Sequence, residues 1–228
     1  MSQKELNSPI EFPLLGRGVG VRLNNVGKRF NREWIFRHFT YQFFSGKTYA
    51  ITGANGSGKS TLLQVIAGSL THNEGTIEFK NGQQTTNNEQ LYSHISIAAP
   101  YLELIEEMTA KEMLLFHAQF KPLILSGVEG SVSIDEILQT AGLQNAANKQ
   151  IRYYSSGMKQ RLKLAQAFFS NTPILLLDEP TTNLDADGIA LYHNLIKNYC
   201  ANKLVIVSSN DKQEYEFCEE VIGVGEYK

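Results

Sequence analysis

The sequence predicts an α/β fold with a mainly parallel sheet, and three observations support this prediction. Residues 173–178 (PILLLD) and 203–209 (KLVIVSS) are short, continuous apolar runs, which are typical of central strands covered on both faces. Residues 48–53 read as another short apolar strand, and residues 60–68, soon after it, have the apolar spacing of a helix. Strands that alternate with helices along a chain indicate parallel α/β units.

The N-terminal part of the chain is richer in strand patterns. Residues 20–30 alternate weakly between apolar and polar side chains, and residues 34–44 alternate strongly. Residues 75–82 read as a strand closed by an Asn-Gly turn, and residues 94–99 read as a further strand. We expect an antiparallel β portion in this N-terminal region.

The middle of the chain has a different character. Residues 103–120 and 133–143 are helical in pattern, and the glycine-containing segment 121–132 separates them. A second amphipathic pattern, residues 156–171, begins with a serine and predicts another helix. A helix-rich insertion therefore interrupts the strands that form the sheet.

These patterns predict one domain, residues 19–228, preceded by a lead-in over residues 1–18. Within the domain, residues 19–100 and 155–228 form the core, and residues 101–154 form the inserted helical part. The lead-in contains four residues that interrupt regular structure: Pro9, Pro13, Gly16 and Gly18.

Composition excludes several classes of function. The 228 residues carry a net charge of −2, which disfavours general binding of nucleic acid through a basic surface. The two cysteines, Cys200 and Cys218, match no metal or redox spacing, so we expect reduced thiols of a cytosolic protein. No apolar run approaches the length of a membrane span, and the polar N-terminus lacks the apolar core of a signal peptide.

The stretch GANGSGKST matches the phosphate-binding pattern G-x-x-x-x-G-K-[ST], and it lies between an apolar strand and a helix, as that pattern requires. Glycines let the backbone wrap closely around a polyphosphate, whose charge is bound by successive N–H groups and the helix N-terminus. Lys59 would reach the β- and γ-phosphates, and Ser60 would ligate Mg²⁺. A glycine-rich turn without a ligand is the alternative. The predicted phosphate-binding residues are Gly53, Ala54, Asn55, Gly56, Ser57, Gly58, Lys59, Ser60 and Thr61.

Two adjacent carboxylates end the strand ILLLDEP. Asp178, at the carboxyl end of the predicted strand, suits a hydrated Mg²⁺ opposite Ser60. Glu179 would then polarise a water molecule for in-line attack on the γ-phosphate. A solvated acidic pair is the alternative, but the phosphate-binding pattern in the same chain makes it less favourable.

The order GANGSGKST, YSSGMKQR and LLLDEPTTNLD resembles the ATP-binding subunits of ABC transporters, over nearly the whole chain from Val21 to Val224. The resemblance implies a RecA-like P-loop NTPase core with an inserted α-helical subdomain. It also implies that two such subunits pair head to tail around two molecules of ATP, with Mg²⁺, as a homodimer or heterodimer. Asp185, in TTNLD, matches the family's segment that communicates between the two sites.

The segment YSSGM is similar to the family's signature, whose serine and glycine contact the γ-phosphate bound by the other subunit. Here Ser155, Ser156 and Gly157 occupy these positions. A simple helix cap is the alternative for these residues taken alone. Phe30 matches the aromatic residue that stacks on adenine, with Trp34 as the rival and a core phenylalanine as the alternative.

The chain departs from the family pattern at three places. In the signature, Ser156 replaces a glycine and Met158 a glutamine. Where the family places a glutamine beside Mg²⁺, the sequence has Pro100, or Ala99 if the loop slips by one residue. Neither a proline nor an alanine side chain can make a hydrogen bond. Tyr101 and Glu103, from the same loop, are two candidates to take the place of the glutamine, and the sequence does not rank them.

The third departure is Asn210, at the position of the family's histidine that contacts the γ-phosphate. Its amide can donate a hydrogen bond but cannot carry positive charge or relay a proton. A turn residue without a catalytic role is the alternative. We therefore expect Glu179, Lys59 and Asn210 to form the catalytic set, with intact ATP binding and slow hydrolysis.

The resemblance implies an ATPase that powers a separate membrane permease from the cytoplasmic face of the membrane. The permease's cytoplasmic helices would dock on the helical subdomain. Two alternatives remain: a soluble ABC-type ATPase acting on nucleic acid or ribosomes, and a degenerate subunit that dimerises on ATP but hardly hydrolyses it. The acidic balance and the single phosphate loop disfavour the first alternative.

Overall fold

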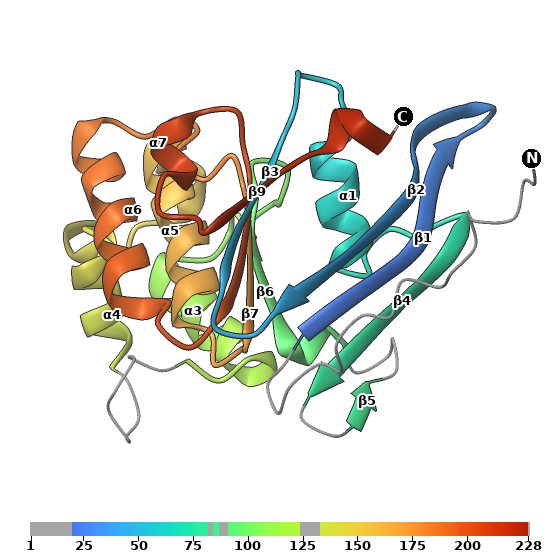
Figure 1. Ribbon diagram of the computed structural model, residues 1–228. Helices are drawn as coiled ribbons and strands as arrows, with labels where there is room; N and C mark the ends of the chain where they lie inside the picture. The colour runs from blue at the N-terminus through green and yellow to red at the C-terminus, as the bar shows by residue number, and fades with distance from the viewer. Residues whose placement is uncertain (1–19, 82–83, 87–90, 124–132, 228) are drawn as a thin grey trace, which may run out of the picture.

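The computed structural model describes residues 20–81, 84–86, 91–123 and 133–227. A parallel sheet with strand order β6-β7-β8-β3-β9 forms the centre of the molecule (Figure 1). Its strands are β3 (Thr48–Thr52), β6 (Ile95–Ala98), β7 (Ile174–Asp178), β8 (Leu204–Ser208) and β9 (Glu220–Gly223). Every residue of β7 and β8 is buried, which confirms the prediction that these two apolar runs are central strands.

A second, antiparallel sheet has strand order β2-β1-β4-β5, as predicted for the N-terminal region. Its strands are β1 (Gly20–Phe30), β2 (Glu33–Phe44), β4 (Glu74–Asn81) and β5 (Gln84–Thr86). The predicted Asn-Gly turn reaches residue 82, and this residue and the predicted lead-in 1–18 lie outside the described residues.

Helix α1 (Lys59–Ile66) lies between the two sheets (Figure 1). Leu62, Leu63 and Ile66 are fully buried there, in one apolar cluster with residues of β1, β2 and the parallel strands. Burying these side chains stabilises the fold by roughly 1.5–3 kcal/mol each. The phosphate-binding stretch therefore precedes a helix that is fixed on both sides.

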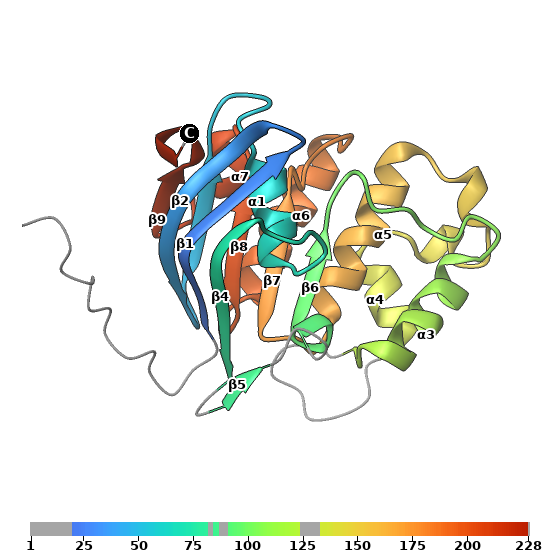
Figure 2. The same cartoon turned by 90° about the vertical axis from the view of Figure 1, so that its right-hand side faces the viewer.

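The other helices lie across the parallel sheet from α1 (Figure 1), and those in the middle of the chain extend beyond the edge strand β6 (Figure 2). They are α3 (Ala110–Phe120), α4 (Ile134–Thr140), α5 (Ser156–Phe169), α6 (Ala186–Tyr199) and the short α7 (Lys212–Tyr215). Single 3₁₀ turns are η1 (Tyr92–His94), η2 (Gln144–Ala146), η3 (Ile151–Tyr153) and η4 (Val224–Tyr227). Within the described ranges, none of these helices has the length and hydrophobicity that crossing a bilayer requires. The division into a core and an insertion at residues 101–154 stays a prediction.

One predicted helix is shorter than its sequence pattern. Residues 103–120 were expected to be helical, but α3 begins only at Ala110, and that part of the prediction is wrong. Thr109 caps the helix: its hydroxyl accepts from the Glu112 backbone, and the Glu112 side chain accepts from the Thr109 backbone. Before the cap, the carbonyls of Glu106 and Met108 accept hydrogen bonds from the backbone N–H groups of residues 151–152. These backbone carbonyls therefore have hydrogen-bond partners although the segment is not helical. The sequence patterns also did not predict α6 or β9.

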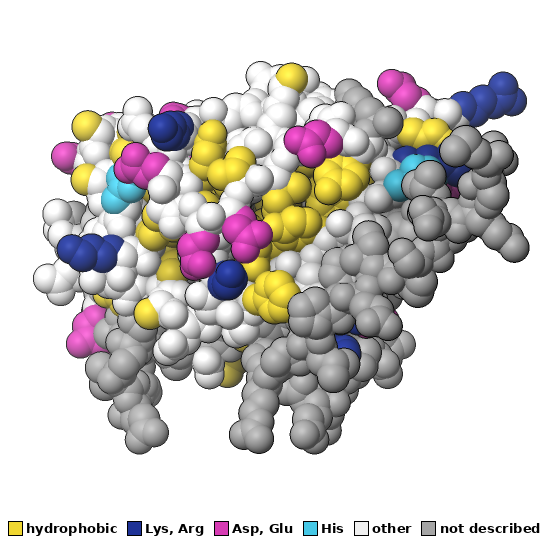
Figure 3. Space-filling model, in the orientation of Figure 1, with side chains coloured by type: hydrophobic (Ala, Val, Ile, Leu, Met, Phe, Trp, Pro, Cys, Tyr) yellow, Lys and Arg dark blue, Asp and Glu magenta, His cyan; other side chains and the backbone are white. Residues whose placement is uncertain are grey.

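Charged side chains are dispersed on the face of the molecule seen in Figure 3. Hydrophobic side chains gather near the middle of this face, with acidic side chains among them, and the visible Lys and Arg side chains are scattered. This face therefore has no continuous basic area among its described residues, in keeping with the net charge of −2.

Candidate active site

Three segments of the predicted site meet at the carboxyl edge of the parallel sheet. Strand β3 leads into Gly53, β7 ends at Asp178, and β8 leads into Asn210. Strand β8 lies between β3 and β7, with Ser208 opposite both Ile51 and Asp178. Crevices at the carboxyl ends of parallel strands are where ligands bind in open α/β sheets.

The loop from Gly53 to Lys59 needs glycine at two positions. Gly53 and Gly58 have φ values of +149° and +102°, which side chains rarely tolerate. A Cβ on Gly58 would lie 2.5 Å from the Cγ2 atom of Ile35. The loop curls around the side chain of Lys59, whose Nζ donates to the Gly53 carbonyl at 2.9 Å. Lys59 is 5% exposed, so the loop holds a nearly buried cation.

A pocket of 240 Å³ opens above this loop. Its lining suits a polyphosphate, because backbone N–H groups, the N-terminus of α1 and the Lys59 ammonium surround it. Ala54 is exposed beside it, and Ser57 is buried with no hydrogen-bond partner for its Oγ among the described residues. The lining residues are Ile35, Asn55, Gly56, Gly58, Lys59, Ser60, Thr61 and Glu179.

Asp178 is nearly buried, with 1% of its surface exposed. Burial raises the pKa of this carboxyl, an effect opposed by the nearby hydroxyls of Ser208 and Ser60. Its Oδ1 has no hydrogen-bond partner among the described residues. A buried carboxylate oxygen that lacks a partner, beside the Ser60 hydroxyl, is a donor set that fits Mg²⁺. Asp178 and Ser60 could therefore hold the predicted metal.

Glu179 has an unusual backbone conformation. Its φ is +41°, in the left-handed region that non-glycine residues seldom adopt. The half-buried side chain lines the phosphate pocket and a second pocket of 320 Å³, which Asn210 also lines. Strained backbones of this kind persist only where the surrounding structure holds them, and they gather at functional sites.

Asn210 contacts the phosphate loop at two points. Its Nδ2 donates to Asn55 Oδ1 at 2.9 Å, and its Oδ1 accepts from the Gly53 backbone N–H at 3.3 Å. Asn210 therefore does more than close the turn after β8. It links that turn to the predicted phosphate-binding loop.

Comparisons with known proteins give this arrangement a family. A family model described as "ABC transporter" matches residues 36–182. The chain belongs to the ABC transporter family. As a member of this family, the cassette is a P-loop ATPase with a transport-coupled role.

Individual relatives agree with this assignment. An uncharacterised ABC transporter ATP-binding protein of Bacillus subtilis, YybJ, is 33% identical over 85% of the cassette and 87% of its own length. The bacitracin transport ATP-binding protein BcrA of Bacillus licheniformis is 29% identical over 90% of the cassette, which spans 66% of that relative's length. A dimeric structure of the ATP-binding cassette MJ0796, in a post-hydrolysis state with ADP and Pi, superimposes with a TM-score of 0.72. It is 27% identical and covers 90% of this cassette and 95% of its own chain.

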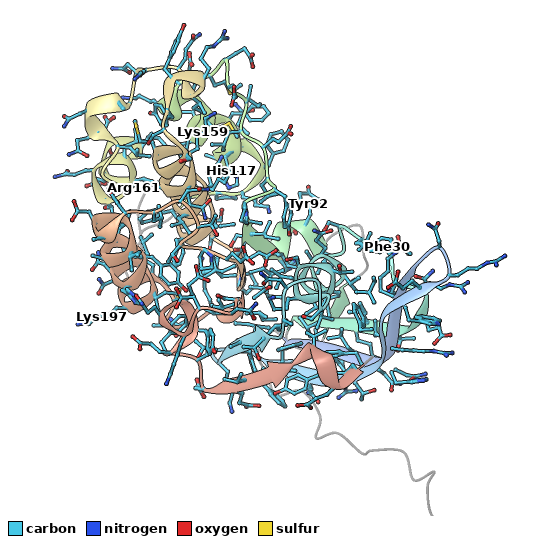
Figure 4. The ribbon with its side chains drawn as sticks, turned by 90° about the horizontal axis from the view of Figure 1, so that it is seen from above. Phe30, Tyr92, His117, Lys159, Arg161 and Lys197 are labelled. Carbon is cyan, nitrogen blue, oxygen red and sulfur yellow. The ribbon has the colours of Figure 1, made fainter. Side chains whose placement is uncertain are left out.

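The signature residues of the cassette lie outside its phosphate pocket. Ser155 caps α5, and its Oγ accepts from the Met158 backbone at 3.2 Å. Ser155 and Ser156 are exposed, and none of the residues 155–157 lines the pocket at Gly53–Thr61. Helix α5, which begins with these residues, lies well away from Phe30, as the labelled Lys159 and Arg161 show in Figure 4. One subunit therefore does not bring its signature onto its own phosphate loop.

Asp185 connects the two helices nearest the signature. Its Oδ1 accepts from the backbone N–H of Gly188, as the cap of α6, and from the guanidinium of Arg161 in α5 at 2.7 Å. These two hydrogen bonds lower the pKa of Asp185. Gly157 packs closely here too, because a Cβ on it would lie 3.0 Å from the Asn183 carbonyl.

The structure separates the two aromatic candidates for adenine stacking. Trp34 is covered by the guanidinium groups of Arg29 and Arg37, 5.5 and 4.5 Å from its ring centroid. Phe30 is 47% exposed at the end of β1, with the Lys28 ammonium 5.0 Å from its ring centroid. Phe30 is thus not a core phenylalanine, and its ring is more open to a ligand than that of Trp34.

The loop that lacks the family's glutamine is anchored by its backbone. The Nζ of Lys163 donates to the carbonyls of Pro100 and Ala99 at 2.8 and 3.3 Å. Burial, together with the negative charge of Asp178, raises the pKa of Tyr101 to about 12, while a hydrogen bond from Gln64 opposes the shift. Tyr101 is therefore close enough to the predicted metal site to be affected by its charge.

Glu103 lies on a different surface of this loop. It lines a groove of 370 Å³ together with Glu106, Lys159 and Lys163. Tyr101 does not line this groove: it is 44% exposed and lines a pocket of 320 Å³ with Gln64 and Tyr92.

Sequence reasoning missed two buried polar side chains next to the site, Gln160 and Glu214. Both are 3% exposed. Glu214 follows the Asn210 turn in a polar stretch that reads as a solvated helix, and no local signal distinguishes it from its exposed neighbour Glu216.

Proposed function

We propose that this cassette binds ATP with Mg²⁺, pairs head to tail with a second cassette and hydrolyses the nucleotide to drive a membrane permease. The observation that carries this proposal is the convergence of Lys59, Glu179 and Asn210 at the carboxyl ends of three neighbouring strands. The transport role of relatives such as BcrA supports the coupling to a permease.

Nucleotide binding is assigned to the phosphate loop and Phe30. Lys59 would exchange its contacts with the loop carbonyls for the β- and γ-phosphates, so its charge would need no new desolvation. The backbone N–H groups of residues 56–61 would bind the remaining phosphate oxygens. The exposed ring of Phe30 would stack on the adenine.

Ser60 and Asp178 would hold Mg²⁺, which neutralises the phosphate charge when it is bound. Glu179 would accept a proton from the attacking water as the general base. Asn210 would donate a neutral hydrogen bond to the γ-phosphate where the family has a histidine. Because this donor carries no charge, we expect slower hydrolysis than the family pattern supports.

The second subunit would complete each site. The Ser155 hydroxyl accepts one hydrogen bond as a cap and still has its own proton to donate. That proton and the N–H groups of Ser156 and Gly157 at the start of α5 would bind the γ-phosphate held by the partner. Asp185 would communicate between the two sites through its contact with Arg161.

A permease would receive the cassette on the cytoplasmic face of a membrane, and the helical part of the cassette would contact it. The exposed side chains Leu115, Phe116 and Phe120 on α3 give this part an apolar outer surface. A partner that covers such a surface removes it from water.

The deciding experiment compares wild type with Glu179→Gln, using Glu216→Gln as a matched control on an exposed glutamate. Glu179→Gln should slow turnover by about a hundredfold or more, to a small residual rate, and trap an ATP-bound dimer, visible by size-exclusion chromatography with MgATP. Glu216→Gln should hydrolyse ATP like wild type. If Glu179→Gln leaves turnover untouched, Glu179 is not the base. If wild type dimerises on ATP without hydrolysing it, the cassette is the degenerate, nucleotide-gated subunit instead.

A further inference from the structure

We infer that Glu214 and Gln160 are positioning residues that hold Glu179 in its working conformation. They do so by binding the two residues that follow it, Pro180 and Thr181. This inference rests on the proposed role of Glu179 as the general base. Neither side chain belongs to the phosphate loop, the acidic pair or the signature serine and glycine.

The need for such support comes from the backbone of Glu179. With φ at +41°, the residue is conformationally strained, and it keeps this geometry only because contacts with its neighbours offset the strain. One such contact is made by the backbone of Glu179 itself: its N–H donates to the Ser208 carbonyl at 2.9 Å. The Glu179 carbonyl accepts from the Thr182 backbone N–H at 3.1 Å, which closes a turn over residues 179–182. Contacts that fix Pro180 and Thr181, inside this turn, therefore also fix the backbone of Glu179.

Glu214 provides the first of these contacts. Its Oε1 accepts from the Thr181 backbone N–H at 2.6 Å and also from the Thr181 hydroxyl. The carboxylate is 3% exposed, and burial raises its pKa, so its position in the interior is costly without these donors. The backbone of Glu214 is fixed in turn, because the fully buried Tyr192 donates from its hydroxyl to the Glu214 carbonyl at 2.6 Å.

Gln160 provides the second contact from the other side. Its Nε2 donates to the Pro180 carbonyl at 2.8 Å, and the side chain is 3% exposed. Gln160 belongs to α5, which begins with the signature residues, whereas Glu214 belongs to α7, which follows Asn210. The two residues after Glu179 are therefore bound to both helices that begin at predicted γ-phosphate contacts.

This geometry implies a specific division of effects. A substitution at Glu214 leaves the phosphate loop and Phe30 intact, so nucleotide affinity should stay the same. It loosens the segment that aims Glu179, so the hydrolysis step should slow. A residue that only stabilised the fold would instead lower the melting temperature and reduce the active fraction without changing the rate per active site.

The test uses Glu214→Gln in the full chain, which keeps the side-chain volume but loses the charge that strengthens the hydrogen bonds from Thr181. Single-turnover hydrolysis should slow about tenfold, which corresponds to the loss of one such contact in the transition state. Affinity for a fluorescent ATP analogue should stay within about twofold of wild type. Glu216→Gln, two residues further along the chain and exposed, is the control and should match wild type in both measurements.

A double variant separates positioning from stability. If Glu214 acts through the Glu179 carboxylate, Glu179→Gln with Glu214→Gln should hydrolyse no more slowly than Glu179→Gln alone. Effects that multiply in the double variant would overturn the inference, as would turnover in Glu214→Gln equal to that of Glu216→Gln. Thr181→Val, which removes only the hydroxyl donor, should give a smaller slowing in the same direction, and it remains measurable if Glu214→Gln folds poorly.

The failure of this inference can be told apart from failure of the proposed function. If Glu179→Gln slows turnover to a small residual rate but Glu214→Gln does not slow it, Glu179 remains the base and only the positioning role is wrong. If Glu179→Gln itself has no effect, both assignments are wrong.

Discussion

Asn210 and Asn55 are joined by a hydrogen bond of 2.9 Å although 155 residues separate them in the chain. Asn210 thus occupies the position of the family's histidine while its amide donor binds the phosphate loop of the same subunit. A second contact, from the Gly53 N–H to Asn210 Oδ1, strengthens the link. These two contacts tie the turn after β8 to the loop that begins at Gly53.

Asn210→His should raise the rate of ATP hydrolysis at saturating MgATP. An imidazole can carry positive charge, and a charged donor stabilises developing negative charge more strongly, so we expect an increase of about threefold or more. Steady-state phosphate release measures the effect. Gln213→His, on an exposed residue of α7, controls for a histidine added nearby. Turnover at or below the wild-type level would show that Asn210 does not limit hydrolysis.

Tyr101→Phe should increase the Mg²⁺ concentration that gives half-maximal hydrolysis. The variant removes only the hydroxyl, whose pKa is raised by burial and by the charge of Asp178. We expect a change of about two- to fivefold, the size of one modest hydrogen bond. Tyr92→Phe is a matched control, because Tyr92 lines the same pocket as Tyr101 and is 60% exposed. Equal Mg²⁺ dependence in the two variants would remove Tyr101 from the metal site.

Phe30→Ala should weaken ATP binding by about fivefold or more, since stacking on one base contributes roughly 1–3 kcal/mol. Phe30→Tyr keeps the ring and should bind like wild type. Trp34→Ala should leave affinity nearly unchanged but lower the melting temperature, because that ring packs against Arg29 and Arg37. Titration with a fluorescent ATP analogue compares the three variants. A larger loss of affinity in Trp34→Ala than in Phe30→Ala would reverse the assignment.

The free energy of unfolding of the cassette should fall as the pH drops below 6.5, because His117 is buried in its neutral form. Burial and the charge of Lys121 lower the pKa of His117 to about 4, so the unfolded chain binds a proton more readily than the folded one. The stability from neutral His117 is complete above pH 6.5 and is lost as the pH falls toward 4. Between pH 7.5 and 5, this loss amounts to about 2 kcal/mol.

Urea unfolding at both pH values measures this change. His117→Gln keeps a donor for the Ser170 hydroxyl, which lies 2.8 Å from His117 Nε2, and should show a smaller loss of stability on acidification. An equal loss in wild type and His117→Gln would assign the pH dependence to other groups.

The amino-acid order was sufficient to predict the features that depend on residues close together in the chain. The run 174–178 is a buried strand because four of its five side chains are large and apolar, with Asp178 at its end. The stretch GANGSGKST wraps around Lys59 because its glycines permit the required turns. The motif order was enough to predict the family, the parallel sheet and the residues at its carboxyl edge.

Contacts between side chains from distant segments became visible only in the folded chain. Tyr101 and Glu103 line different pockets because of the way the loop after β6 leaves the sheet, which no local pattern encodes. The helix predicted from residue 103 begins at 110 because residues 106 and 108 pair with 151–152 instead. Glu214 and Glu216 look alike in sequence, but only Glu214 is buried and contacts Thr181. Strands β7 and β8 pair side by side, which brings the segments that follow them together. A buried carboxylate needs hydrogen-bond donors, and Thr181 supplies them to the carboxylate that we propose supports Glu179.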